Sequence, residues 1–189
     1  AVISALQALG GTVFVFDSST GQELQRFPRD DPAGWQFGYS VSIDDDNFVV
    51  GDRFDSEVGV VSGAAVLFTS GIIFDPPIDV ATIGEPTAVS TVDFTGSNGN
   101  DIAITELGET REENGRLVVL VNDNGSGISY TEAETPVGLA PSAVAIGEFD
   151  GVSGPDAAVC NAGDNNVMIL LNDGAGTGYF LADPDTVDV

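Results

Sequence analysis

The chain repeats itself with a period of about 50 residues, and this repeat restricts its fold more than any other feature. Pro-Thr-Ala-Val at residue 86 returns as Pro-Ser-Ala-Val at residue 141, and Asp-Ile-Ala at 101 returns as Asp-Ala-Ala at 156. Both offsets are 55 residues (141 minus 86, 156 minus 101). Val-Asn-Asp at 121 returns as Leu-Asn-Asp at 171, an offset of 50, so the earlier copy has about five extra residues in a loop. A fixed period of this size indicates a stacked or circular array of one small structural element.

Each copy is expected to contain four short strands. Val, Ile, Thr and Phe stand in short runs between Gly, Asn and Asp, and no apolar stripe of helical period is sustained. Residues 1–10 are mildly apolar and fit either a lead-in strand or a short helix remnant. The expected strands are residues 11–16, 23–27, 35–43, 48–51, 63–68, 72–74, 87–94, 102–107, 116–122, 128–132, 142–149, 157–161, 166–172 and 179–182.

The third strand of each copy marks the period best. Gly11, Gly63, Gly115 and Asn165 open it, at spacings of 52, 52 and 50 residues. Because this strand occurs four times and the first strand three times, we expect three whole copies after a half copy. The predicted boundaries are 1–34 for the lead-in and the half copy (third and fourth strands), then 35–85, 86–140 and 141–189.

A four-stranded meander repeated every ~50 residues is typical of a β-propeller blade. The copy 35–85 resembles the FG-GAP repeat of integrin-α-type propellers, through Phe37-Gly38-Tyr39-Ser40-Val41, Val49-Val50-Gly51 and residues 63–68. The two later copies resemble the bacterial VCBS-type repeat, through Asp-Phe or Glu-Phe, a glycine-rich turn, Asp-Ile-Ala or Asp-Ala-Ala, and Leu-Asn-Asp-Gly. The resemblance spans residues 11–182 and implies an all-β fold of about three and a half propeller blades.

Three and a half blades leave two open faces, whereas propellers close with about four to eight blades and this family is usually seven-bladed. Either the chain is a fragment of a longer propeller, or two chains complete one ring. The expected partners therefore include further blades from the same or an identical chain, which would make a homo-oligomer.

The resemblance also implies calcium loops between the first two strands of a blade, of the form Asp-x-Asp-x-Asp-Gly-x-x-Asp. A hard cation needs several oxygens converging on one tight turn. In the copy 86–140 the matching positions are Asp93, Thr95, Ser97 and Asp101, with Asn98 at the turn glycine. In the last copy they are Glu148, Asp150, Val152 and Asp156, of which Val152 cannot bind a metal.

These departures from the pattern imply weak Ca²⁺ sites, and the hairpin 44–47 of the copy 35–85 is too short for such a loop. An alternative stays open for the two later copies. In it the loops have lost calcium and remain as turns, with Asp93 and Asp156 capping backbone amides.

The charge of the chain excludes several classes of function. Thirty acidic residues against five arginines, with no lysine or histidine, give a net charge of −25. This field repels nucleic acid and anionic membranes and attracts cations or basic partners. No apolar run approaches the ~20 residues of a membrane span, so no membrane insertion is expected.

Catalysis has few candidate groups. Without histidine or lysine there is no imidazole base for a hydrolytic triad and no amine for a Schiff base. A carboxylate pair of the glycosidase kind is compatible with the composition, but nearly all the acids stand in turns, where solvation explains them. Arg111 and Arg116 flank the inserted loop, where they clamp an anion or simply belong to a solvated loop. We therefore expect no catalytic residues, no enzyme activity and no cofactor besides Ca²⁺.

Two further features bear on the environment of the chain. Cys160 is the one cysteine, which excludes an intrachain disulfide, and its apolar run Ala-Ala-Val-Cys predicts a buried side chain in a strand. The chain begins at Ala1 without a basic leader segment, so either a leader has been removed or the chain is a piece of something longer.

The expected function is that of a non-catalytic, extracellular or cell-surface propeller segment. It binds a protein or a glycan through the loops at one rim, or serves as a scaffold. Two alternatives stay open: an accessory domain of a secreted enzyme, and a structural subunit of a surface layer or filament with pairing between blade edges.

Overall fold

The computed structural model describes residues 2–6, 11–28, 37–44, 47–52, 64–68, 78–81, 84–96, 99–110, 112–122, 130–152, 154–181 and 184–189. These residues form strands and turns, and no helix that could cross a membrane occurs among them. The all-β prediction is confirmed. The chain divides into two compact units, Ala1–Pro86 and Thr87–Val189, which we describe separately.

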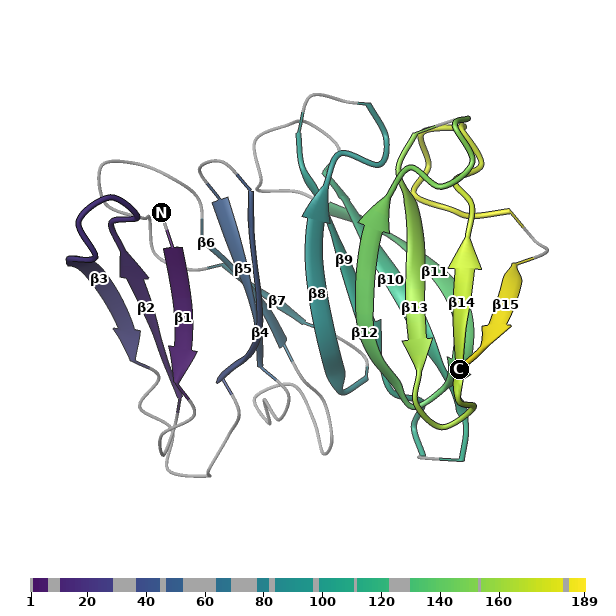
Figure 1. Ribbon diagram of the computed structural model, residues 1–189, viewed down its shortest axis with the longest axis horizontal. Helices are drawn as coiled ribbons and strands as arrows, with labels where there is room; N and C mark the ends of the chain where they lie inside the picture. Colours follow the sequence, from purple (N-terminus) through teal and green to yellow (C-terminus); the bar gives the residue numbers. More distant parts are fainter. Residues whose placement is uncertain are drawn as a thin grey trace. The chain divides into compact units, whose positions relative to one another are not determined.

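The first unit contains two antiparallel sheets whose strands follow one another in chain order (Figure 1). The first sheet has three strands: β1 (Val2–Leu6), β2 (Thr12–Phe16) and β3 (Glu23–Pro28). The second sheet has four: β4 (Phe37–Asp44), β5 (Asn47–Asp52), β6 (Ala64–Phe68) and β7 (Ile78–Ala81). Residues 2–6 are therefore a lead-in strand and not a helix.

The second unit also contains two antiparallel sheets, each a meander of four strands (Figure 1). One is built from β8 (Pro86–Val92), β9 (Asp101–Glu106), β10 (Asn114–Asn122) and β11 (Tyr130–Leu139). The other is built from β12 (Pro141–Gly147), β13 (Asp156–Asn161), β14 (Asn166–Leu170) and β15 (Asp185–Asp188). These sheets have the strand order expected of propeller blades.

A tight turn joins β2 to β3, as the Asp17–Gly21 sequence predicts. The backbone closes with Asp17 N donating to Gln22 O at 2.8 Å and Gly21 N donating to Asp17 O at 2.8 Å. The Asp17 carboxylate accepts the amides of Ser19 and Thr20 at 2.8 and 2.9 Å, together with the Ser19 hydroxyl. These donors, the hydroxyl first, lower the pKa of Asp17 to about 2.

The core of the first unit lies between its two sheets. Val13 and Val15 alternate with outward residues on β2 and are at most 1% exposed. They pack with buried residues of the second sheet, namely Phe37, Phe48, Val50, Val66 and Phe68. The Phe48 and Phe68 rings stack with centroids 4.3 Å apart, so aromatic contacts add to the aliphatic core.

The core of the second unit is built in the same way. Alternate residues of β10, Leu117, Val119 and Val121, face the last sheet and are at most 9% exposed. The last sheet contributes Ala157, Val159 and Leu170 from β13 and β14, each fully buried. Period-two alternation on both sheets thus places one apolar face of each against the other.

The strands β2, β6, β10 and β14 correspond to the third strand of the sequence repeat. Each has two faces, which we name from these cores. The front face points toward the following sheet of the same unit, and the back face points toward the preceding one. The front residues in the two cores are Val13 and Val15 on β2 and Leu117 and Val119 on β10. The back residues are Val66 and Phe68 on β6 and Met168 and Leu170 on β14. Within each unit, a front face packs on a back face.

The fourth strands differ from the sequence-based expectation. Residues 72–74 lie outside the described residues, and the strand that pairs with β6 is β7, after the two prolines. The strand expected at 128–132 is β11, which continues to Leu139. Of the strand expected at 179–182, Phe180 makes one isolated bridge with Asn172, and β15 is the strand that pairs with β14.

The reason is that the fourth strands lack the sequence pattern of a buried strand. All four residues of β15 are exposed, so no buried alternation marks it in the sequence. Proline is tolerated at a sheet edge because its missing N–H is not needed there, and Pro136 stands inside β11.

The predicted burial of Cys160 is also wrong. It lies in β13 as expected, but its side chain is exposed and not buried. Ala157 and Val159 point into the core, so Cys160, at the alternate position, points to the other side of the sheet.

Candidate functional site

The loop between β12 and β13 is the strongest candidate site, because three carboxylates meet there. Glu148, Asp150 and Asp156 can each offer one oxygen within 4.8 Å of the other two. Glu148 and Asp150 are exposed, whereas Asp156 opens β13 and is fully buried. The structure therefore brings together the three carboxylates that the sequence predicted in this loop.

The loop is held by its own side chains. Gly151 N donates to Glu148 Oε1 at 2.8 Å, and Val152 N donates to Asp150 Oδ1 at 2.8 Å. Gly151 has a φ of 76°, which a glycine adopts without strain. The Asp-Gly sequence thus makes the turn that directs both exposed carboxylates toward Asp156.

Asp156 joins this loop to the end of β14. Its Oδ2 accepts the Phe149 amide at 2.7 Å, and its Oδ1 accepts the Asn172 amide at 2.8 Å. The Asn172 side chain donates in turn to Pro155 O and to Phe94 O, both at 3.1 Å. Asn172 therefore connects the last sheet to the corresponding loop of the sheet before it.

Asp101 accepts equivalent hydrogen bonds in the loop between β8 and β9. Its Oδ2 accepts the amides of Phe94 and Thr95 at 2.9 and 3.2 Å, and its Oδ1 accepts the Asn122 amide at 2.8 Å. The Asn122 side chain donates to Asn100 O at 3.4 Å. Asp101 and Asp156 thus occupy one repeated position with one repeated hydrogen-bond pattern.

Among the described residues, the β8–β9 loop contains fewer candidate metal ligands than the sequence predicted. Asp93 Oδ1 accepts the Gly96 amide at 2.6 Å and the Thr95 hydroxyl at 3.5 Å. Ser97 and Asn98 lie outside the described residues. Asp93 and Asp156 both accept hydrogen bonds from backbone amides, as the sequence-based alternative predicts.

Burial raises the pKa of the Asp101 carboxyl above its ordinary value. The nearby charge of Asp93 acts in the same direction, while the amides of Asn122, Phe94 and Thr95 oppose the shift. Burial and the Asp93 charge thus both disfavour the ionised form of Asp101. A bound cation would lower the free energy of the ionised form.

Calcium fits the β12–β13 loop better than the β8–β9 loop. Ca²⁺ takes about six to eight oxygen ligands at 2.3–2.6 Å, with carboxylates as the preferred donors. The β12–β13 loop offers three carboxylates, and backbone carbonyls or water must supply the other ligands, because Val152 has no donor atom. In the β8–β9 loop the described candidates are two carboxylates and the Thr95 hydroxyl.

Sequence reasoning missed Asn122 and Asn172. The signal was present, since both stand in the recurring Val-Asn-Asp and Leu-Asn-Asp motifs. Their role depends on the register that brings the end of the third strand to the start of the second, which the repeat alone does not give.

Four exposed apolar residues lie at the same end of the last sheet as these carboxylates. We call them the rim patch: Phe149, Val152, Tyr179 and Leu181, with exposed fractions of 49%, 59%, 48% and 49%. The first two lie in the β12–β13 loop and the other two follow β14, whose end neighbours the start of β13. The rim patch and the three carboxylates therefore lie at one end of the last sheet.

The loop that carries Tyr179 is fixed in place. The Asp173 carboxylate accepts the Ala175 amide at 2.8 Å and the Thr177 hydroxyl at 3.3 Å. Gly178 lies so close to the neighbouring sheet that an added Cβ would be 2.7 Å from Val121 Cγ2. Tyr179 is thus presented by a loop packed on its neighbour.

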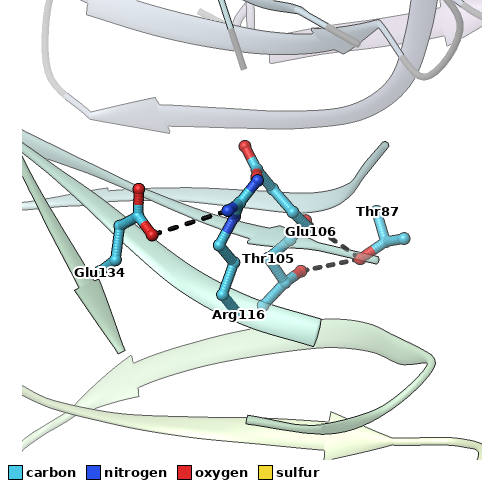
Figure 2. A network of polar contacts seen from close by, with 5 residues as sticks. All are labelled: Thr87, Thr105, Glu106, Arg116 and Glu134. Carbon is cyan, nitrogen blue, oxygen red and sulfur yellow. Dashed lines mark hydrogen bonds and ion pairs between the residues drawn. The ribbon is translucent and has the colours of Figure 1, made fainter. Parts of the chain in front are cut away.

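Arg116 is held by carboxylates and does not offer a free anion clamp (Figure 2). Its Nε donates to Glu106 Oε2 at 2.7 Å, and its Nη1 lies 3.6 Å from Glu134 Oε2. Glu106 is 1% exposed and stands opposite Arg116 in the β9–β10 pair. Figure 2 also shows the Thr87 and Thr105 hydroxyls, 2.9 Å apart, beside this pair. Arg111 lies outside the described residues.

We expect Arg116→Met to lower the free energy of unfolding by about 3 kcal/mol, because it leaves the Glu106 charge buried without its arginine. The matched control is Glu134→Gln, which breaks only the longer, exposed pair and should cost about 0.5 kcal/mol. Urea denaturation followed by circular dichroism measures both. Equal losses in the two variants would contradict a special role for the buried pair.

Comparison with known proteins bears on the first unit. Residues 22–68 match the family model of the FG-GAP repeat. The matched segment runs from β3 through β6, so it links the first sheet to three strands of the second. A search of the curated proteins returned no match. The resemblance read from Phe37-Gly38-Tyr39 and its neighbours is thereby confirmed, as a similarity of residues 22–68 to the FG-GAP repeat.

Proposed function

We propose that the chain is a non-catalytic binding module of the β-propeller type, at the cell surface or outside the cell. It holds a protein or glycan ligand at the loop end of its last sheet. The observation that carries the proposal is the rim patch beside three carboxylates. The FG-GAP repeat supports it, because the rigid sheets of such repeats present loops at their ends.

The acidic groups of the second unit favour binding over catalysis. Asp101 and Asp156 are occupied by backbone amides, and Glu106 is occupied by Arg116. Glu148 and Asp150 are exposed and hold their own turn. The sequence has no histidine or lysine to supply a base or nucleophile near pH 7.

The rim patch suits a ligand with apolar faces and polar or cationic groups. The Phe149 and Tyr179 rings can stack on the C–H face of a sugar or pack against a peptide side chain. Exposed carboxylates accept hydrogen bonds from hydroxyl or ammonium groups. The net charge of −25 adds a long-range attraction for basic partners.

The binding role is tested with an oligosaccharide array and a panel of basic proteins as probes. We expect at least one probe to bind, with its signal reduced about tenfold in Phe149→Ala and Tyr179→Ala, since buried aromatic anchors contribute about 1.4 kcal/mol or more. Leu24→Ala, which removes a side chain 60% exposed in the first unit, is the matched control. Loss of signal in the control as well, or binding unchanged in both rim variants, would contradict the proposal.

We propose in addition that Ca²⁺ binds among Glu148, Asp150 and Asp156. With a dissociation constant of about 0.1 to 1 mM, Ca²⁺ at about 10 mM stabilises the folded state by about 1.4 to 2.7 kcal/mol. For a unit of roughly 100 residues, this raises the melting temperature by about 5 °C or more relative to a chelator.

Two variants, measured in the same thermal melts, test whether Ca²⁺ binds at these three carboxylates. Asp150→Asn should remove most of the calcium-dependent rise, whereas Asp164→Asn should keep it. Asp164 also accepts an exposed backbone amide, from Leu139 at 2.8 Å, but is not one of the three carboxylates. An equal rise in both variants, or no rise in the wild-type chain, would show that no calcium ion binds in this loop.

A further inference from the structure

The charge of the second unit is nearly all of one sign. Thr87–Val189 contains 17 acidic residues and two arginines, so its net charge is −15 (2 minus 17) out of the −25 of the whole chain. Arg116 is the one arginine among the described residues of this unit, and Glu106 and Glu134 hold it. The second unit therefore has almost no positive charge left to neutralise its other carboxylates.

Many of these carboxylates lie at the surface of the first sheet of the unit. The loop between β9 and β10 carries Glu109, Glu112 and Glu113, and all three are exposed. On β11, the exposed Glu132 and Glu134 are two residues apart and stand on one side of the strand, which separates them by about 7 Å. Like charges are therefore close to one another in both the loop and the strand.

Further carboxylates lie on the last sheet. Three come together in the β12–β13 loop, where their oxygens lie within 4.8 Å of one another. Asp164 is exposed in the β13–β14 turn, and Asp185 and Asp188 are exposed on β15. In the described part of the unit, no arginine forms an ion pair with any of these side chains. Negative charge without an arginine partner is therefore spread over both sheets.

Folding brings these charges closer together. A chain of roughly 100 residues has a radius of gyration of about 13 Å when folded and about 30 Å when unfolded. The Debye length is about 30 Å at roughly 0.01 M salt and about 3 Å at roughly 1 M. In dilute salt the carboxylates therefore repel one another across the whole folded unit, whereas in concentrated salt only direct neighbours do.

We infer that ionic strength controls the stability of the second unit, so that salt stabilises its folded state and dilution weakens it. The effect is the screening of many carboxylates, and it needs no ion bound at one site. It also acts on whatever the unit binds, because an unfolded unit presents no binding surface. The inference stands independently of the proposed ligand and of the proposed calcium ion.

Thermal melts of the full chain, followed by circular dichroism with a chelator in every sample, test the inference. The chelator removes divalent ions, so a shift reports on the monovalent salt alone. We expect the melting temperature to rise by at least about 10 °C between roughly 0.01 and 1 M potassium chloride. Hydrogen exchange of peptides from β9 and β10 assigns the gain to the second unit. A melting temperature that stays constant or falls would overturn the inference.

A charge variant separates screening from the general effect of salts on apolar burial. Glu109→Gln, Glu112→Gln and Glu113→Gln together change the net charge of the unit from −15 to −12 (−15 plus 3). The salt-dependent rise in melting temperature should shrink by about a third, because the repulsive energy grows as the square of the net charge. In dilute salt this variant should melt at a higher temperature than the wild-type chain does.

The matched control replaces the same three glutamates with aspartate, which keeps the charge and should keep the wild-type rise. All three positions are exposed and lie outside the core, so neither set of substitutions removes a buried apolar contact. An equal rise in the glutamine variant and in the wild-type chain would show that salt acts on apolar burial and not on these charges, and would overturn the inference.

Discussion

Replacing Asp101 with alanine is expected to lower the free energy of unfolding of the second unit by about 4 kcal/mol. Three backbone amides, those of Phe94, Thr95 and Asn122, donate to this carboxylate. Each buried amide left without an acceptor costs about 1–3 kcal/mol. The removal of a buried charge offsets part of the loss, because burial already raises the pKa of Asp101 and so disfavours its ionised form.

The matched control is Asp150→Ala in the corresponding loop of the last sheet. Asp150 is exposed and accepts one exposed amide, that of Val152, so its loss should be about 0.5 kcal/mol in calcium-free buffer. Guanidinium denaturation followed by circular dichroism measures both variants. If Asp101→Ala lowered the free energy of unfolding no more than Asp150→Ala does, the hydrogen bonds of the buried carboxylate would not stabilise this end of the sheet.

Replacing Gly11 with alanine is expected to cost about 3 kcal/mol or more in the first unit. Gly11 has a φ of 72°, in the left-handed region that disfavours a side chain. An added Cβ would lie 2.2 Å from Phe37 O and 2.9 Å from Phe37 C. Both are backbone atoms of β4, so the strand itself must move to make room.

Gly21→Ala separates the two causes. Gly21 has a similar φ of 70°, but an added Cβ would meet nothing within 4 Å. This variant should therefore lose about 1 kcal/mol, which is the conformational cost alone. Thermal and urea denaturation of both variants measure the difference. Equal losses would contradict the close contact between Gly11 and β4.

The sequence predicted the first three strands of the four-stranded sheets and misplaced their fourth strands. The third strands were found because Gly or Asn opens each of them and an apolar run follows. The fourth strands were misplaced because β15 is exposed at every position and β11 contains Pro136, so neither has the pattern of a buried strand. The exposure of Cys160 was not predicted because an apolar run does not show which of its two faces is covered.

Of the candidate site, the sequence predicted the residues but not their connections. The family pattern identified Glu148, Asp150 and Asp156 from spacing along one loop. The bond from Asn172 to Asp156 joins positions 16 residues apart, and the bond from Asn172 to Phe94 joins positions 78 apart. The first bond depends on the strand register within the last sheet, and the second depends on how two sheets stack. No local sequence pattern encodes either.

The central claim is that equivalent sheets stack with a front face on a back face. Methyl-to-methyl nuclear Overhauser contacts in the labelled chain test it most directly. The account predicts contacts from Leu117, Val119 and Val121 to Val159 and Leu170, across the core of the second unit. Contacts from Val118 and Leu120 to Val159 and Leu170 would mean that the opposite face of β10 meets the last sheet, and would contradict it.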